Sequence, residues 1–219
     1  PNDIPAVAIV DPELMYSMPK GLTAATGMDA LTHAIESYIT PGAWVMSDMF
    51  ELKAIEMIAQ NLKAAVDNGK DVAAREAMSQ AQYIAGMGFS NVGLGIVHSM
   101  AHPLGAFYDT PHGVANALLL PYVMEYNAES PAAPKYIHIA KAMGVDTTGM
   151  SEAEGVKAAI EAVKALSISI NIPQKLHEIN VKEEDIPALA VAAYNDVCTG
   201  GNPRPTSVAD IEALYHKAF

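Results

Sequence analysis

The most constraining feature of this sequence is the stretch GLGIVHSMAHPLGAFYDTPHG, residues 93–113, which holds three of the seven histidines. His98 and His102 are four residues apart, so on a helix their side chains lie about 40° apart on one face. His112 follows Pro111 and is expected at the start of the next helix. A buried imidazole needs a hydrogen-bond partner or a metal ion. The stretch therefore indicates a metal site on two helices, and three separately satisfied core histidines are the alternative.

Pro103 affects where the helix expected in this stretch kinks or ends. The run from Gly93 to Met100 is small and apolar, which favours a buried helix. The residue before a proline is pushed away from helical angles. We therefore expect His102 at a kink or at the end of that helix.

A second cluster of polar side chains is expected on an earlier helix. Asp29 and His33 are four residues apart and Glu36 is three further on, so the three groups fall within about 60° of the helix wheel. Such an Asp-x-x-x-His pair alone is more often a surface hydrogen bond than a metal site. Together with the histidine stretch it provides carboxylate and imidazole ligands without a thiolate. That set suits Fe²⁺ or Zn²⁺ and neither Ca²⁺ nor Mg²⁺, and such a metal acts as a Lewis acid on an oxygen.

Composition excludes several classes of partner. The chain has 219 residues and a net charge of −12 without a basic cluster, so we expect no nucleic-acid partner. The longest apolar stretch, residues 114–124, contains Asn116 and Pro121 and is far shorter than the roughly 20 residues of a membrane helix. The single cysteine, Cys198, excludes an internal disulfide framework and favours a reducing compartment, the cytoplasm.

Hydrophobic spacing predicts an all-α bundle of about eight or nine helices. Capping boxes at Ser151-x-x-Glu154 and Ser207-x-x-Asp210 mark two helix starts. Residues 86–95, GMGFSNVGLG, are expected to form a glycine-rich break whose glycines permit close helix packing. In addition to the helix of the histidine stretch, the expected helices cover residues 23–38, 44–66, 71–87, 113–127, 132–143, 151–168, 182–196 and 207–218.

The beginning of the chain differs from the rest. Ala6–Val10 is short and rich in β-branched residues, which predicts a strand. A lone strand is not stable without a sheet, so we expect an upstream sheet-containing domain. This gives residues 1–20 as an interdomain strand and turn, and residues 21–219 as an all-helical domain.

Two long motifs resemble a known family. The segments AIVDPELMYSMPKGLTAATGMDALTHAIE, residues 8–36, and GIVHSMAHPLGAFYDTPHGVA, residues 95–115, resemble both signature regions of the iron-containing (group III) alcohol dehydrogenases. The resemblance covers the whole chain, including CTGGNPR near its end. It implies the C-terminal helical domain of a dehydroquinate synthase-like fold. That family's N-terminal α/β domain binds NAD through a Gly-Gly-Gly-Ser loop, which does not occur in this sequence.

The resemblance also implies roles for individual residues. His102 would stand beside the nicotinamide and the substrate as an unligated proton-relay residue. The metal ligands would be Asp29, His33, His98 and His112. Beyond the family's own roles, we expect Leu14 and Met18 to touch the cofactor because they follow the predicted strand. We also expect Phe89 and Cys198 in the substrate pocket wall, with plain core packing as the alternative for each.

The implied activity is hydride transfer between NAD(H) and a small alcohol or aldehyde, with lactaldehyde and propane-1,2-diol as the expected pair. The family also implies a homodimer and NAD(H) bound mainly by the N-terminal domain. A propane-1,3-diol or longer-chain alcohol dehydrogenase is the alternative within the family. From other classes, a metal-dependent hydrolase is disfavoured by the absence of an Arg/Lys cluster, and a non-catalytic helical module would leave the site groups without a role.

Overall fold

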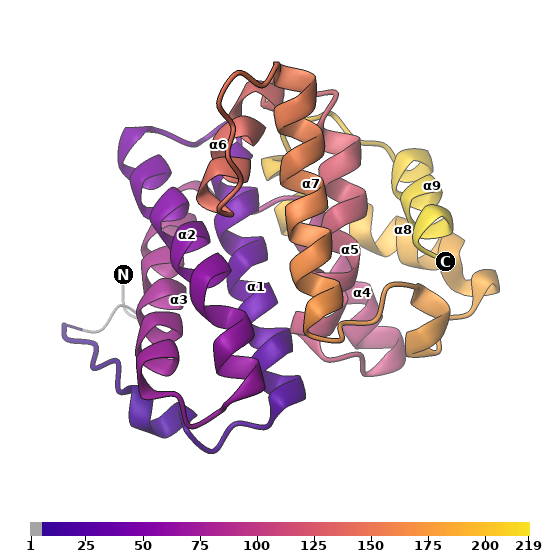
Figure 1. Ribbon diagram of the computed structural model, residues 1–219. Helices are drawn as coiled ribbons and strands as arrows, with labels where there is room; N and C mark the ends of the chain where they lie inside the picture. Colours follow the sequence, from indigo (N-terminus) through magenta and orange to yellow (C-terminus); the bar gives the residue numbers. More distant parts are fainter. Residues whose placement is uncertain (1–5) are drawn as a thin grey trace.

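The computed structural model describes residues 6–219, and within that range the regular structure is entirely helical (Figure 1). Residues 1–5 of the predicted interdomain segment lie outside the described residues. The nine α-helices of the described part are α1 (Lys20–Ile39), α2 (Val45–Asp67), α3 (Val72–Val92), α4 (Ile96–Tyr108), α5 (His112–Asn127), α6 (Tyr136–Ala142), α7 (Glu152–Ser169), α8 (Ile186–Tyr194) and α9 (Val208–Ala218). Short 3-10 helices lie between them: η1 (Pro12–Met15), η2 (Ala133–Lys135), η3 (Leu176–Ile179), η4 (Glu183–Asp185) and η5 (Val197–Gly201).

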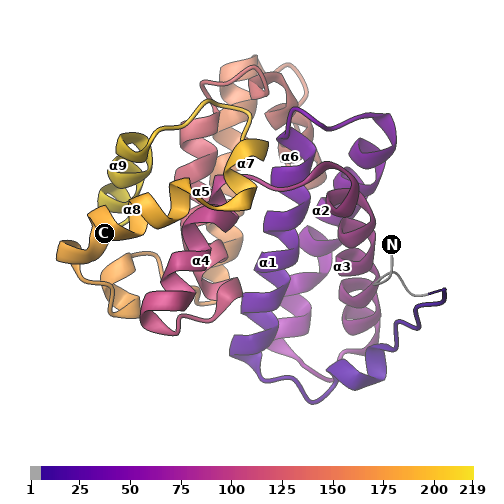
Figure 2. The same ribbon diagram turned by 180° about the vertical axis from the view of Figure 1, so that it is seen from behind.

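Helix α1 is the central element. It packs against α2 and α3 on one side and against α5 on the other, and α4 pairs with α5 (Figures 1 and 2). Leu31, Ala34 and Ile35 of α1 are fully buried in the core. Helices α8 and α9 pack together, and α8 also covers α4. The middle of α1 therefore lies where the two halves of the bundle meet.

Helix ends follow local sequence signals. Helix α1 begins directly after Pro19 and ends at Ile39. Its C-cap, Thr40, precedes Pro41 and has an extended backbone, as expected from the restriction that a proline places on its neighbour. The predicted capping boxes at Ser151 and Ser207 are confirmed, because each serine side chain accepts a hydrogen bond from the backbone N–H three residues later. None of the helices in the described part is both long enough and apolar enough to cross a membrane.

The predicted strand at Ala6–Val10 is wrong for this structure. The segment has no regular structure, and the side chains of Val7 and Ile9 are 77% and 88% exposed. The β-branched pattern provides strand propensity, but residues 6–219 contain no other strand to supply hydrogen-bond partners.

Two further expectations need correction. The predicted break at residues 86–95 begins later, because α3 continues through Gly86 and Gly88 to Val92. Gly88 lies against Glu51 of α2, where a Cβ atom would come within 1.9 Å of a carboxylate oxygen, so close packing is confirmed at this glycine. The end of α4 is also later than predicted. Pro103 lies inside the helix, which continues to Tyr108, so His102 is not at a helix end.

Candidate metal centre

Four of the predicted site residues come together from three helices. Helix α1 provides Asp29 and His33, α4 provides His98, and α5 begins with His112. Ligand atoms of Asp29, His33 and His98 all lie within 4.8 Å of one another. The Oδ1 atom of Asp29 is 3.7 Å from Nε2 of His98 and 3.5 Å from Nε2 of His112. Asp29 is thus the group that faces both histidines of the later stretch.

This spacing fits a single small divalent cation. Two ligand atoms at about 2.0–2.2 Å from one tetrahedral ion are about 3.3–3.6 Å apart, close to the separations around Asp29. The Nε2 atom of His98 is buried and has no hydrogen-bond partner. A buried polar atom without a hydrogen-bond partner is costly unless something binds it. The donor set, one carboxylate and three imidazoles, is suited to Fe²⁺ or Zn²⁺.

Asn116, one turn after His112 on α5, also contacts this centre. Its Nδ2 atom donates to Oδ1 of Asp29 at 2.6 Å and lies 3.0 Å from Nε2 of His112. The side chain is fully buried, and its Oδ1 atom has no partner. Asn116 was not predicted as a site residue. Its spacing of four from His112 is the only sequence signal that points to it.

Burial holds two of the histidines in the neutral form that can bind a metal. Burial lowers the pKa of His33 to about 4, and the neighbouring imidazole of His98 adds to the effect. Burial likewise lowers the pKa of His112, against the opposing effect of Asp29. For His98, burial alone would lower the pKa, but the adjacent Glu36 carboxylate outweighs it and the pKa is raised.

Glu36 was placed on the correct helix face by its spacing, but no role was predicted for it. Its side chain is 2% exposed, and its carboxylate lies 2.5 Å from Nδ1 of His98. The other carboxylate oxygen accepts a hydrogen bond from the backbone N–H of Val97 at 2.7 Å. The contact joins residues 62 positions apart, and nothing in the local sequence indicates it.

His102 lies beside this centre and contacts a different partner. Its ring stacks on His112, with ring centroids 5.4 Å apart and an interplanar angle of 16°. Its Nδ1 atom lies 2.7 Å from Oδ2 of Asp196, the residue that caps η5. The side chains of His102 and His112 are 42% and 43% exposed, whereas that of His98 is 2% exposed. The centre is therefore open to solvent on the side of His102 and His112.

Cys198 belongs to the neighbourhood of His102. It lies in η5, and its backbone N–H donates to Oδ1 of Asp196 at 2.8 Å. Ligand atoms of His102, Asp196 and Cys198 lie within 4.8 Å of one another. Burial, together with the Asp196 carboxylate, raises the pKa of the Cys198 thiol to about 12. The thiol therefore keeps its proton at neutral pH when no metal ion is bound.

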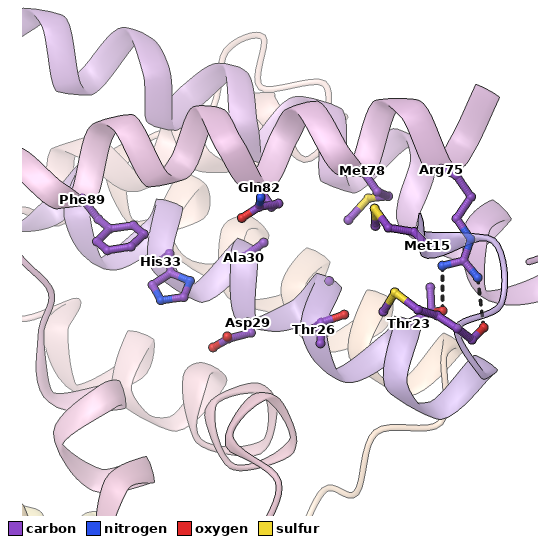
Figure 3. Close-up of a pocket in the computed structure, with 12 residues that line it drawn as sticks. Met15, Thr23, Thr26, Asp29, Ala30, His33, Arg75, Met78, Gln82 and Phe89 are labelled. Carbon is purple, nitrogen blue, oxygen red and sulfur yellow. Dashed lines mark hydrogen bonds between the residues drawn. The ribbon is translucent and has the colours of Figure 1, made fainter. Parts of the chain in front are cut away.

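A cavity of about 360 Å³ lies between α1, α3 and η1, directly beside the candidate centre (Figure 3). Phe89 stacks on His33 at one end of it, with ring centroids 4.5 Å apart and nearly parallel planes. Of the two residues predicted to touch the cofactor, Met18 lines this cavity, whereas Leu14 does not and its side chain is 80% exposed. Of the two residues predicted for the pocket wall, Phe89 lines this cavity beside His33, whereas Cys198 does not line it and lies near His102.

Comparisons with known proteins agree on one family. Residues 23–219 match the family described as the Fe-containing alcohol dehydrogenase family, C-terminal. The chain is 59% identical over 219 residues to lactaldehyde reductase of Escherichia coli (strain K12), covering 100% of this chain and 56% of that protein. It is 46% identical over 215 residues to the NAD-dependent methanol dehydrogenase of Bacillus methanolicus, covering 98% and 56%.

A solved structure also resembles this chain over nearly its whole length. The crystal structure of 1,3-propanediol oxidoreductase superimposes with a TM-score of 0.97 at 47% sequence identity, covering 99% of this chain and 56% of that one. The chain thus spans 56% of the length of each of these relatives.

Proposed function

Because the chain belongs to the iron-containing alcohol dehydrogenase family, as its C-terminal part, we propose that it is the metal-binding half of an NAD(H)-linked dehydrogenase of small alcohols. Membership of this family supports this proposal over a metal-dependent hydrolase and over a non-catalytic helical module. The proposed ligands of one Fe²⁺ ion, which Zn²⁺ can replace, are Asp29, His33, His98 and His112.

The observation that carries the proposal is the convergence of Asp29, His98 and His112. The Asp29 carboxylate oxygen lies 3.7 and 3.5 Å from the Nε2 atoms of the two imidazoles, and that of His98 is buried without a partner. These groups come from three helices, so their convergence is a property of the whole fold. Core histidines that were satisfied separately would not leave a buried Nε2 atom directed at a carboxylate.

The groups around this centre suit alcohol–aldehyde interconversion. A divalent ion held there supplies Lewis-acid polarisation of the substrate oxygen, and the nicotinamide supplies the hydride chemistry. The contribution of the chain itself is proton transfer by His102. Asp196 engages its Nδ1 atom, which leaves Nε2 to exchange a proton with the substrate oxygen. An imidazole has a pKa suited to that exchange at neutral pH.

The substrate we propose is lactaldehyde, reduced to propane-1,2-diol. The support is the 59% identity to a lactaldehyde reductase, against 46% and 47% to the proteins named for methanol and 1,3-propanediol. Phe89 contacts His33 and Cys198 lies near His102, and we assign both to the wall of the substrate pocket. Propane-1,3-diol and other small alcohols are the alternatives.

The rest of the enzyme is proposed from the family. Residues 1–20 would connect to an N-terminal NAD-binding domain, and Leu14 and Met18 would approach the cofactor there. Leu14 is 80% exposed, so it is accessible to such a partner domain. We also propose a homodimer located in the cytoplasm, where the thiol of Cys198 would stay reduced.

A metal titration tests the centre. The 219-residue chain should bind one Zn²⁺ per molecule, and His98→Ala should abolish that binding. The matched control is His216→Ala, because His216 lies on α9 with a 45% exposed side chain. An equal loss of Zn²⁺ binding in the two variants, or no Zn²⁺ binding by the unmodified chain, would show that the ligand assignment is wrong.

An absorbance assay tests the activity. The complete two-domain enzyme, loaded with Fe²⁺, should oxidise NADH with lactaldehyde and reduce NAD⁺ with propane-1,2-diol. Faster turnover with propane-1,3-diol or methanol would replace the proposed substrate while keeping the family chemistry.

A further inference from the structure

Glu36 contacts two different groups at the start of α4. One carboxylate oxygen, Oε2, lies 2.5 Å from Nδ1 of His98, and the other, Oε1, accepts the backbone N–H of Val97 at 2.7 Å. The side chain is 2% exposed. Gly95, the N-cap of α4, has no side chain that could cap the helix. A Cβ atom on Gly95 would lie 2.9 Å from Oε1, so the carboxylate occupies the space that a capping side chain would need.

We propose that Glu36 is a positioning residue that fixes the tautomer of His98, so that Nδ1 carries the proton and Nε2 is free to bind the metal. This inference rests on the proposed metal centre and adds to it a residue that is not a ligand. By the same contacts Glu36 caps the first turn of α4.

The hydrogen-bond roles follow from what each partner can do. The N–H of Val97 can only donate, so Oε1 must accept. Oε2 belongs to a carboxylate, which can only accept when it is ionised, so Nδ1 of His98 carries the N–H of this contact. A neutral imidazole carries one N–H, which leaves a lone pair on Nε2. That atom is the buried one without a partner, and it faces Asp29 at 3.7 Å.

The position of Glu36 on α1 links the ligands of two helices. Asp29, His33 and Glu36 follow one another at spacings of four and three, so they share one face of α1. Two of them are proposed ligands, and the third reaches across to the ligand on α4. A hydrogen-bonded carboxylate behind a ligating histidine sets the ring's orientation, and its loss typically costs 10–100-fold in metal affinity. Helix α1 thereby places three of the four proposed ligands, two directly and one through Glu36.

The substitution Glu36→Gln separates this role from mere packing. The N–H of Val97 still requires an acceptor, so the carbonyl of the new amide must face Val97. Its NH₂ group then faces Nδ1 of His98, which has to become an acceptor. The proton is thereby forced onto Nε2, the atom that should bind the metal. A residue that only fills space would leave the tautomer unchanged on this near-isosteric change.

The first measurement needs no metal. At a pH high enough for His98 to be neutral, long-range ¹H–¹⁵N correlation spectra of the metal-free 219-residue chain should show His98 protonated on Nδ1 alone, and the Glu36→Gln variant should show it protonated on Nε2 alone. The matched control is Glu51→Gln, because Glu51 is also fully buried but bonds to Ser37 and to no imidazole. It should leave the His98 tautomer unchanged. His98 protonated on Nε2 in the unmodified chain would overturn the inference, even if the variant failed to fold.

The second measurement is a Zn²⁺ titration of the same three proteins. Glu36→Gln should raise the dissociation constant by about 10–100-fold, and Glu51→Gln should not change it. If the unmodified chain binds Zn²⁺ and Glu36→Gln binds it equally well, the role of Glu36 is refuted while the metal centre stands. If the unmodified chain binds no Zn²⁺, the proposed centre fails and the inference fails with it.

Discussion

Nδ1 of His102 lies 2.7 Å from Oδ2 of Asp196, although 94 residues separate the two in the sequence. Asp196 is held in turn by the backbone N–H of Cys198 at 2.8 Å. Burial alone would raise the pKa of Asp196, but this N–H and His102 outweigh it and hold the pKa below its usual value. Asp196 therefore stays an anion that orients the His102 ring, and it leaves Nε2 as the nitrogen available for proton transfer.

The first prediction separates His102 from the proposed ligands. In the complete enzyme, His102→Ala should keep the metal and lower turnover by roughly 10²–10⁴-fold, the range for loss of general acid–base catalysis. Asp196→Asn should show part of that loss, because it removes the anion behind the ring and keeps the ring itself. Metal content and NADH turnover are the two measurements. A metal-free His102→Ala protein would show that His102 is a ligand instead.

The second prediction concerns the contact that positions His112. Gly113 faces α1 so closely that a Cβ atom would lie 2.4 Å from the carbonyl oxygen of Ala25. Gly113→Ala should push the start of α5 away from α1, lowering the free energy of unfolding by roughly 1–3 kcal/mol and weakening Zn²⁺ binding. Gly86 on α3 is the matched control, because open space surrounds it. Gly86→Ala should stabilise the helix by about 0.5–1 kcal/mol. Equal Zn²⁺ affinities in the two variants would contradict this account.

Much of this architecture could be predicted because its signals are local. Capping boxes and apolar spacing predicted helices whose ends differ by a few residues from those observed. The errors have non-local causes. Ala6–Val10 has strand propensity, but the described part of the chain offers it no sheet. Gly88 lies within α3 and leaves room for Glu51 of a neighbouring helix, which the local sequence does not show.

The candidate site likewise has residues whose placement the sequence predicted and contacts that it did not predict. Spacing placed Asp29 with His33 on one helix, and His98 with His102 on another, and the structure brings these groups to one place. The partners of the histidines could not be predicted. Glu36 meets His98 across 62 positions, and Asp196 meets His102 across 94. Such contacts depend on how the helices pack, and a single sequence does not reveal that.

The third prediction concerns Arg75, which is fully buried at the far end of the cavity from Phe89 (Figure 3). Its guanidinium donates to the hydroxyl of Thr23 at 2.8 Å and to the carbonyl oxygens of Gly69 and Met18 at 3.0 and 3.1 Å. It thereby joins the α2–α3 loop to the segment that leads into α1. Arg75→Met should lower the free energy of unfolding by roughly 2–4 kcal/mol, because buried acceptors lose their donor.

Urea unfolding measures this loss. Arg75→Lys keeps the charge but cannot reproduce the planar fork of donors, so it should recover only part of the stability. The control is Lys63→Met, because Lys63 is 46% exposed and forms a surface ion pair with Asp67. It should change the unfolding free energy by no more than about 0.5 kcal/mol. A loss at Lys63 as large as that at Arg75 would refute the role given to the buried hydrogen bonds.

The last prediction concerns Glu51, a fully buried acid on α2. One of its carboxylate oxygens accepts the hydroxyl of Ser37 at 2.5 Å, and the other has no partner. Burial raises the pKa of Glu51 from 4.5 to about 8, although the Ser37 hydrogen bond opposes the change. Between these values the folded chain keeps the proton and the unfolded chain loses it. The contribution of Glu51 to stability is therefore fully present below about pH 4.5 and is lost as the pH rises towards 8.

Glu51→Gln removes this dependence, because an amide does not ionise. The variant should unfold with a free energy close to that of the unmodified chain at pH 5. At pH 9 it should be more stable than the unmodified chain by roughly 2–4 kcal/mol, the size expected for a shift of several pKa units in a buried group. Urea unfolding at the two pH values gives both numbers. Glu56→Gln on the same helix is the control, because the Glu56 side chain is 43% exposed, and it should show no such gain at pH 9. A gain at pH 9 no larger than that of this control would mean that Glu51 is ionised in the folded chain, and that the α1–α2–α3 packing accommodates a buried charge.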